Sequence, residues 1–125
     1  MRRVVCCLAL STFLTATPAA AAPIYLECSL AQASGHTTQV DLTLNENNGT
    51  ASLLFRETGA ADAELPAVFT ARDVTITRQG QRPYLRTIYR VDRTTLTFAE
   101  DHMIDNVSSL QRRGTCQLAQ ADRAF

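Results

Sequence analysis

The stretch QVDLTLNENNGTASLLF (residues 39–55) decides the fold class. Apolar and polar side chains alternate through both of its halves. The apolar positions are Val40, Leu42, Leu44, Ala51, Leu53 and Phe55. Alternation of period two is typical of a strand with one buried face. Asn48-Gly49 lies between the halves, and both residues tolerate the positive φ of a tight turn. The stretch therefore predicts a β-hairpin with an apolar inner face.

The same alternation recurs along most of the chain. Further strands are predicted at residues 24–30, 67–71, 74–78, 84–92, 95–100 and 114–119. The composition of residues 58–66 predicts a loop that Pro66 ends, and residues 101–110 predict a loop or a single helical turn. About eight short strands with short connections predict an all-β fold, either an antiparallel β-sandwich or a small closed barrel.

The N-terminus has the order of a secretory signal peptide. Two arginines, an apolar run and then small residues follow one another within residues 1–22. The apolar run is too short for a membrane-spanning helix. We expect cleavage near Ala20 or Ala22, which leaves one β domain at residues 23–125 in the periplasm or outside the cell. Loss of two arginines would bring the net charge to about −2, too close to neutral to favour nucleic acid or an anionic membrane as a partner.

The four cysteines divide into two pairs. Cys6 and Cys7 leave with the leader; they follow only two apolar residues, whereas a lipidation signal needs its apolar stretch before the cysteine. Cys28 and Cys116 remain, and an even pair in an exported protein predicts a disulfide. If the first and last strands are neighbours, this disulfide pins two strands that would otherwise be free edges.

The C-terminal third resembles a loose group of small exported bacterial β proteins. The matching residues are Val91, Arg93, Thr94, Leu96, Gly114 and Cys116, with Cys28 as the partner cysteine. In that group a glycine commonly follows the threonine, where this chain has Thr95. The resemblance implies an exported β protein with one disulfide, and it implies no active site.

A second similarity is to periplasmic inhibitors of C-type lysozyme. Those proteins are small β-barrels with terminal cysteines and a Ser-Gly inhibitory loop. This chain has ASGH at residues 33–36 and SSLQRRG at residues 108–114. Since glycine supplies positive φ in many turns, a Ser-Gly pair in a turn is also expected without any inhibitory role.

The sequence shows no catalytic or metal-binding constellation. His36 and His102 are the only histidines, and they are far apart in sequence. We expect His102, which lies between Asp101 and Asp105, to be a solvated loop residue. No serine stands in a nucleophile motif, and no glycine-rich loop could cradle a phosphate. The prediction is therefore a protein that is not an enzyme and carries neither cofactor nor metal.

Arginine gives the one candidate binding surface. Arg86, Ile88 and Arg90 alternate onto one face of the strand predicted at residues 84–92, with Arg82 and Tyr84 in the turn before it. Guanidinium groups bind carboxylates through paired hydrogen bonds, and arginine and tyrosine are enriched at binding hot spots.

Period two alone leaves the orientation of that face open. One alternative is a solvated outer face whose charge is balanced by Asp73, Asp92 and Glu100 across strands. Another is that the odd-numbered residues point outward, so that the arginines are buried and need carboxylate partners.

From the sequence we therefore expect a monomeric, exported binding or interaction protein. Its partner would be a protein or an anionic polymer. The first alternative is an inhibitor of a cell-wall hydrolase such as lysozyme, and the second is a hydrolytic enzyme.

Overall fold

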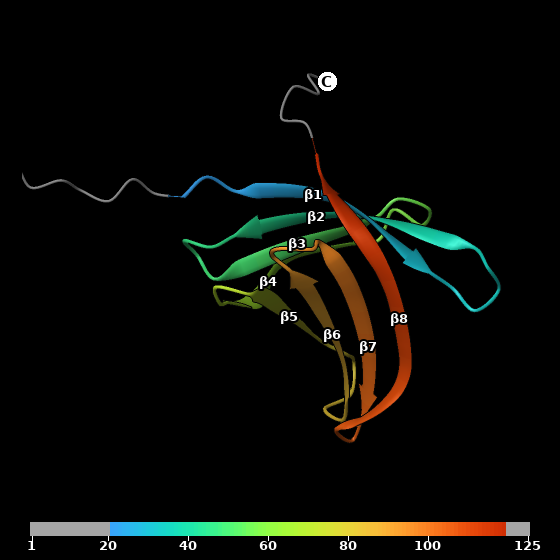
Figure 1. The fold of residues 1–125 in the computed structure, drawn as a ribbon. Helices are drawn as coiled ribbons and strands as arrows, with labels where there is room; N and C mark the ends of the chain where they lie inside the picture. The colour runs from blue at the N-terminus through green and yellow to red at the C-terminus, as the bar shows by residue number, and fades with distance from the viewer. Residues whose placement is uncertain (1–20, 120–125) are drawn as a thin grey trace, which may run out of the picture.

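Eight antiparallel strands form a closed barrel in the computed structural model, which describes residues 21–119 (Figure 1). They are β1 (Ile24–Ala31), β2 (Thr37–Asn45), β3 (Thr50–Phe55), β4 (Ala61–Phe69), β5 (Asp73–Gln79), β6 (Leu85–Asp92), β7 (Thr97–Ile104) and β8 (Val107–Leu118). Each strand pairs with the next, and β8 pairs with β1. The all-β prediction is confirmed, and the barrel is the correct one of the two architectures. Within residues 21–119 no helix is long and apolar enough to cross a membrane.

The hairpin predicted at residues 39–55 is β2 and β3. Gly49 ends the turn with a φ of 62°. The inner face is apolar, as predicted. Its buried residues are Val40, Leu42, Leu44, Ala51 and Leu53, and Phe55 packs against them.

The barrel closes where β8 meets β1. Cys28 and Cys116 lie directly opposite each other, with their Cα atoms 4.0 Å apart, and form the predicted disulfide. Two residues before Cys116, Gly114 lies opposite Leu30, and a Cβ atom there would lie 1.6 Å from the carbonyl oxygen of Ser29. Only glycine therefore allows β8 to approach β1 closely enough at this point.

The prediction of a loop over residues 58–66 holds only for residues 58–60 and is wrong from Ala61 on. Strand β4 begins at Ala61 and pairs with β3, and Pro66 lies opposite Thr50. A register shift and a φ of 55° at Glu64 interrupt the pairing. Proline has no N–H to donate. It is tolerated in a strand beside such an irregularity because the ladder is already interrupted there and no hydrogen bond is lost.

The segment at residues 101–110 is neither a loop nor a helical turn. It is the hairpin of β7 and β8, joined by Asp105 and Asn106, which both have positive φ. Asparagine and aspartate adopt that conformation more readily than most residues. The strand predicted at residues 95–100 therefore continues as far as Ile104.

The turn between β6 and β7 has its positive φ at Leu96, not at Thr95. The Asp92 carboxylate accepts the N–H groups of Thr94 and Thr95, each at 2.8 Å. The hydrogen bonds from Thr95 and Thr94 hold the pKa of Asp92 below its usual value. Thr95 therefore fits this turn without the conformational freedom of glycine.

The register of β5 to β8 arranges their inner side chains in layers. The first layer places Val74, Val91, Phe98 and Gly114 side by side. The second layer is Ile76, Tyr89, Glu100 and Arg112, and the third is Arg78, Thr87, His102 and Leu110. The interior therefore changes from apolar to polar along the barrel axis. The polar end is the one that carries the β5–β6 and β7–β8 turns.

Candidate functional site

Strand β6 carries three of the residues predicted to form a binding surface. Its buried side chains are Thr87, Tyr89 and Val91. Arg86, Ile88 and Arg90 therefore lie on the outer face, where Arg90 is exposed and the other two are half-buried. The alternative in which these arginines are buried does not hold.

The other two predicted residues lie in the turn between β5 and β6. The Nη1 of Arg82 donates to the hydroxyl of Tyr84 at 3.0 Å, and both side chains are exposed. The N–H of Asp105 donates to the carbonyl oxygen of Tyr84 at 3.0 Å, which ties this turn to the β7–β8 turn. Arg86 and Asp105 border a cavity of about 310 Å³ between the two turns. The structure thus places all five predicted residues along one edge and one outer face of the barrel.

The outer face has a hollow at Ala99 on β7. Ala99 lies opposite Arg90 of β6 and also opposite Arg113 of β8, so the two arginines flank an alanine across three strands. A cavity of about 170 Å³ lies there, and Ile88 and Asp101 also line it. Among residues 21–119 neither arginine has a carboxylate partner, and Asp101 instead accepts a hydrogen bond from Ser108 at 2.6 Å. We call Arg86, Ile88, Arg90, Ala99 and Arg113 the arginine face.

Arg113 was missed by the sequence analysis. Its position beside Arg90 depends on the register of β6, β7 and β8, and the β7–β8 hairpin was not recognised. The signal that could have found it is Asp105-Asn106, a pair that fits a two-residue hairpin turn. A hairpin there would have placed β8 beside β7.

Glu100 does not balance the arginines on the outer face, as one sequence-based alternative had it. It lies inside the barrel, 1% exposed, where its Oε1 accepts the Nε of Arg112 at 2.6 Å. His102 Nε2 lies 2.9 Å from the same oxygen. His102 is accordingly a half-buried inner residue, so the expectation of a solvated loop histidine is wrong as well. A buried carboxylate needs such partners because an isolated buried charge is costly.

The buried cluster orders a hydroxyl, an imidazole and a carboxylate in series. Thr87 Oγ1 lies 3.2 Å from His102 Nδ1, and His102 Nε2 lies 2.9 Å from Glu100. A neutral imidazole fits if Nε2–H donates to Glu100 while Nδ1 accepts from the threonine hydroxyl. This order is the one that activates a nucleophile in hydrolases, but such catalysis also needs donors aimed at the developing oxyanion. A cavity of about 390 Å³ next to Thr87 and His102 has Leu85 and Ile104 in its wall.

Tyr89 completes the cluster from β6. Its ring stacks on Phe98 with centroids 5.8 Å apart, and the guanidinium of Arg78 lies 5.9 Å from the ring centroid. The hydroxyl is buried and has no hydrogen-bond partner among residues 21–119. Burial, and then the charge of Glu100, raise the pKa of Tyr89 above its usual value. Tyr89 is therefore a neutral phenol at physiological pH.

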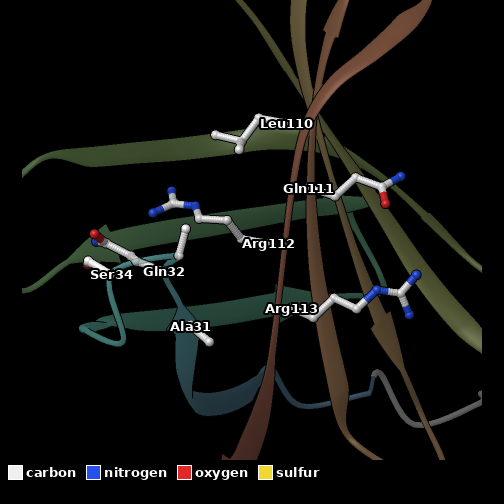
Figure 2. Close-up of a pocket in the computed structure, with 8 residues that line it drawn as sticks. Ala31, Gln32, Ser34, Leu110, Gln111, Arg112 and Arg113 are labelled. Carbon is white, nitrogen blue, oxygen red and sulfur yellow. The ribbon is translucent and has the colours of Figure 1, made fainter.

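A larger groove of about 720 Å³ separates β8 from the turn between β1 and β2. Figure 2 shows Leu110 and Arg112 pointing from β8 toward that turn, while Gln111 and Arg113 point away from it. The turn contributes Ala31, Gln32, Ala33 and Ser34 to the other wall. The Ser34-Gly35 pair thus lies beside the groove, and Gly35 has the positive φ, 83°, expected of a turn glycine.

The other predicted features lie apart from the arginine face. His36 pairs with Glu57 at 2.9 Å on the exposed turns. The part of the chain that the structure describes holds no group of three His, Cys, Asp or Glu residues that could bind a metal ion. The predicted signal peptide, residues 1–22, lies almost wholly outside the described residues.

Comparison with known proteins does not identify this chain. No protein family, no curated protein sequence and no solved structure matches this chain. Function must therefore be argued from the site itself.

Proposed function

We propose that this chain is a non-catalytic binding protein that docks a carboxylate-bearing protein surface on its arginine face. The observation that carries the proposal is the pair of unpartnered arginines, Arg90 and Arg113, on either side of the Ala99 hollow. Most other described arginines have a partner, as Arg56 does with Asp41 and Arg93 with Glu46. An arginine that is left without an acid can pair with one on a partner molecule.

The surroundings of the two arginines support protein binding. Ile88 and Met103 are half-buried apolar side chains at the same hollow, so a partner would cover apolar surface as well as charge. Interfaces combine such an apolar centre with arginine contacts and a polar rim. An anionic polymer, the other partner class expected from the sequence, would use the charges alone.

Pull-down of partners from an envelope extract tests the proposal with Arg90→Ala/Arg113→Ala. We expect recovery of the bound protein to fall at least about fivefold, because truncating a hot-spot arginine typically costs more than 1 kcal/mol. Arg72→Ala is the matched control, since Arg72 is exposed and lies in the turn between β4 and β5, outside the arginine face. Equal recovery by the wild type and both variants contradicts the proposal. Recovery of nucleic acid or polysaccharide in place of protein would assign the face to a polymer.

The proposal that the protein is not an enzyme has its own test at Thr87 and His102. A hydrolase screen with esters, amides and glycosides should give no turnover above background. Turnover that His102→Gln abolishes and His36→Gln leaves intact would make the buried hydroxyl–imidazole–carboxylate series catalytic.

Export is also part of the proposal. The disulfide between Cys28 and Cys116 supports it, because such bonds persist in oxidising compartments. The intact mass of the protein from a native host should correspond to a chain that begins near residue 21 or 23. A full-length mass in the soluble cytoplasmic fraction would contradict export.

A second candidate function, inhibition of a C-type lysozyme, is favoured by the Ser34-Gly35 turn beside the groove of about 720 Å³. Lysozyme activity measured with one equivalent of the purified protein tests this directly. Ser34→Ala should relieve any inhibition if the turn enters the enzyme. Arg90→Ala/Arg113→Ala should relieve it if the arginine face is the contact.

A further inference from the structure

Strand β8 has a free edge over half of its length. Its C-terminal half pairs with β1 from Gly114 to Leu118. Residues 107–113 pair with β7 alone, with a register shift that leaves Ser109 with no residue opposite it on β7. Figure 1 shows β8 crossing β1 and then running on beside β7 with no strand on its other side. The free edge presents backbone N–H and C=O groups that no strand of residues 21–119 pairs.

The free edge forms one wall of the groove beside the β1–β2 turn. The groove's volume, about 720 Å³, lies within the range of ligand sites in proteins. In Figure 2, Gln32 and Ser34 lie across the groove from Leu110 and Arg112. An extended segment in this groove would therefore lie beside β8 and under the turn.

The two faces of the free edge differ in chemistry. On the inner face, Leu110 is 52% exposed although it points toward the barrel, and Arg112 is already paired with Glu100. On the outer face, Arg113 has no acidic partner among residues 21–119. Residues opposite each other on neighbouring strands interact directly, so a complementary strand has an apolar residue beside Leu110 and an acidic one beside Arg113.

We propose that residues 107–113 bind an extended segment of a partner protein as an added strand, with apolar side chains facing inward and acidic side chains facing outward. Strand addition of this kind takes its affinity from backbone hydrogen bonds and its specificity from alternate side chains. The inference rests on the proposed function, since the outward acidic residue pairs with Arg113 of the arginine face. It adds the conformation of the partner and the place where its backbone binds.

A second copy of this chain is the competing occupant. Two β8 edges could pair about a two-fold axis, but Arg113 would then remain without an acid because residues 107–113 contain no aspartate or glutamate. Charge complementarity therefore favours an acidic segment from another protein.

The test uses a capped heptapeptide that alternates valine and glutamate. NMR of the protein with its disulfide intact should show that backbone amides within residues 107–113 exchange more slowly when this peptide is added. A peptide with alternate backbone amides N-methylated keeps the side chains but cannot pair as a strand. It should bind at least about tenfold more weakly, because it loses two or more hydrogen bonds.

The charge pairing is tested by Arg113→Glu, with Arg72→Glu as the matched control, because Arg72 is an exposed arginine in the β4–β5 turn, outside the arginine face. Arg113→Glu should weaken binding of the glutamate peptide about fivefold and strengthen binding of a valine–lysine peptide, since opposite charges become like charges across the strand pair. Arg72→Glu should change the affinities much less.

Three outcomes would overturn the inference. They are equal binding of the N-methylated peptide, no change in amide exchange within residues 107–113, and protection of those amides only as the protein dimerises on its own. If the arginine-face variants still lose their protein partner, the proposed function stands and strand addition alone fails. If the peptide binds but recovery of no protein partner depends on Arg90 and Arg113, strand addition stands and the proposed function fails.

Discussion

The two halves of the barrel interior differ in composition and in closure. In the half near the ends of the described chain, β1 and β8 are paired and joined by the disulfide, and the interior is apolar around Phe98. In the other half β8 has left β1, and the inner side chains include Glu100, His102 and Arg112. Where the strands pair, water is excluded and apolar packing is favoured. Where they separate, polar side chains line the interior and satisfy one another.

The largest effect should come from Gly114, where the closed half begins. We expect Gly114→Val to destabilise the protein by about 5 kcal/mol, because the new side chain overlaps the backbone of Ser29 and forces β1 and β8 apart. Urea unfolding measures the change. Gly35→Ala is the control: its Cβ meets nothing within 4 Å, and only its positive φ is unfavourable, at about 1 kcal/mol. Similar losses for the two variants would mean that the β1–β8 contact does not close the barrel.

Loss of the disulfide should have the next largest effect. Cys28→Ala/Cys116→Ala opens a loop whose ends are 88 residues apart, which corresponds to about 4.6 kcal/mol in the chain-entropy description. Urea unfolding of the variant and of the reduced wild type should agree. Intact mass after alkylation without reductant is the check on the bond itself. Two alkylated thiols in the unreduced protein would show that the bond does not form.

The closed half was largely predictable, because its strands alternate apolar and polar residues without interruption. The hairpin at residues 39–55 followed from the local pattern, and the pairing of Cys28 with Cys116 followed from the even pair of cysteines and the expected export. The irregular pairing of β4 did not, since Glu64 and Pro66 disguise a strand that only its contact with β3 stabilises.

The polar half was mispredicted for a physical reason. Phe98 is buried inside the barrel, and strict alternation puts Glu100 on the same face two residues later. Because carboxylates are usually exposed, Glu100 was expected on the outer face despite the alternation. The rule fails here because two partners meet the carboxylate inside the barrel. His102 lies two residues further along β7 on the same face, and Arg112 lies opposite Glu100 on β8, where only the register of β7 and β8 places it. The same register, which the sequence did not reveal, places Arg90 and Arg113 on either side of Ala99.

Glu100 provides the third test, on the polar half. Glu100→Leu should destabilise the protein by about 3 kcal/mol, because it leaves the guanidinium of Arg112 inside the barrel without its carboxylate. Glu100→Leu/Arg112→Leu should recover much of that loss, since it removes both charges together. Asp41→Ala breaks an exposed pair with Arg56 and should cost far less, because solvent screens such pairs. Equal losses for Glu100→Leu and Asp41→Ala would mean that the two halves are not energetically distinct.

The smallest effect should come from Tyr89, at the boundary between the halves. Its hydroxyl is buried without a hydrogen-bond partner, so Tyr89→Phe should change the stability at pH 7 by less than about 1 kcal/mol and leave the ring stacked on Phe98.

The variant should differ more clearly from the wild type at alkaline pH. The pKa of Tyr89 is raised in the folded protein, so above pH ~10 the unfolded chain loses a proton that the folded one keeps. Above that pH, the loss of the Tyr89 proton in the unfolded chain should lower the free energy of unfolding of the wild type by about 1.4 kcal/mol per pH unit. The Tyr89→Phe variant should not show this decrease. Urea unfolding of both proteins between pH 9 and 11 measures this difference, with Tyr84→Phe as the exposed control. Parallel pH profiles for the wild type and Tyr89→Phe would show that water reaches the hydroxyl and that the polar half extends further into the barrel than the layers indicate.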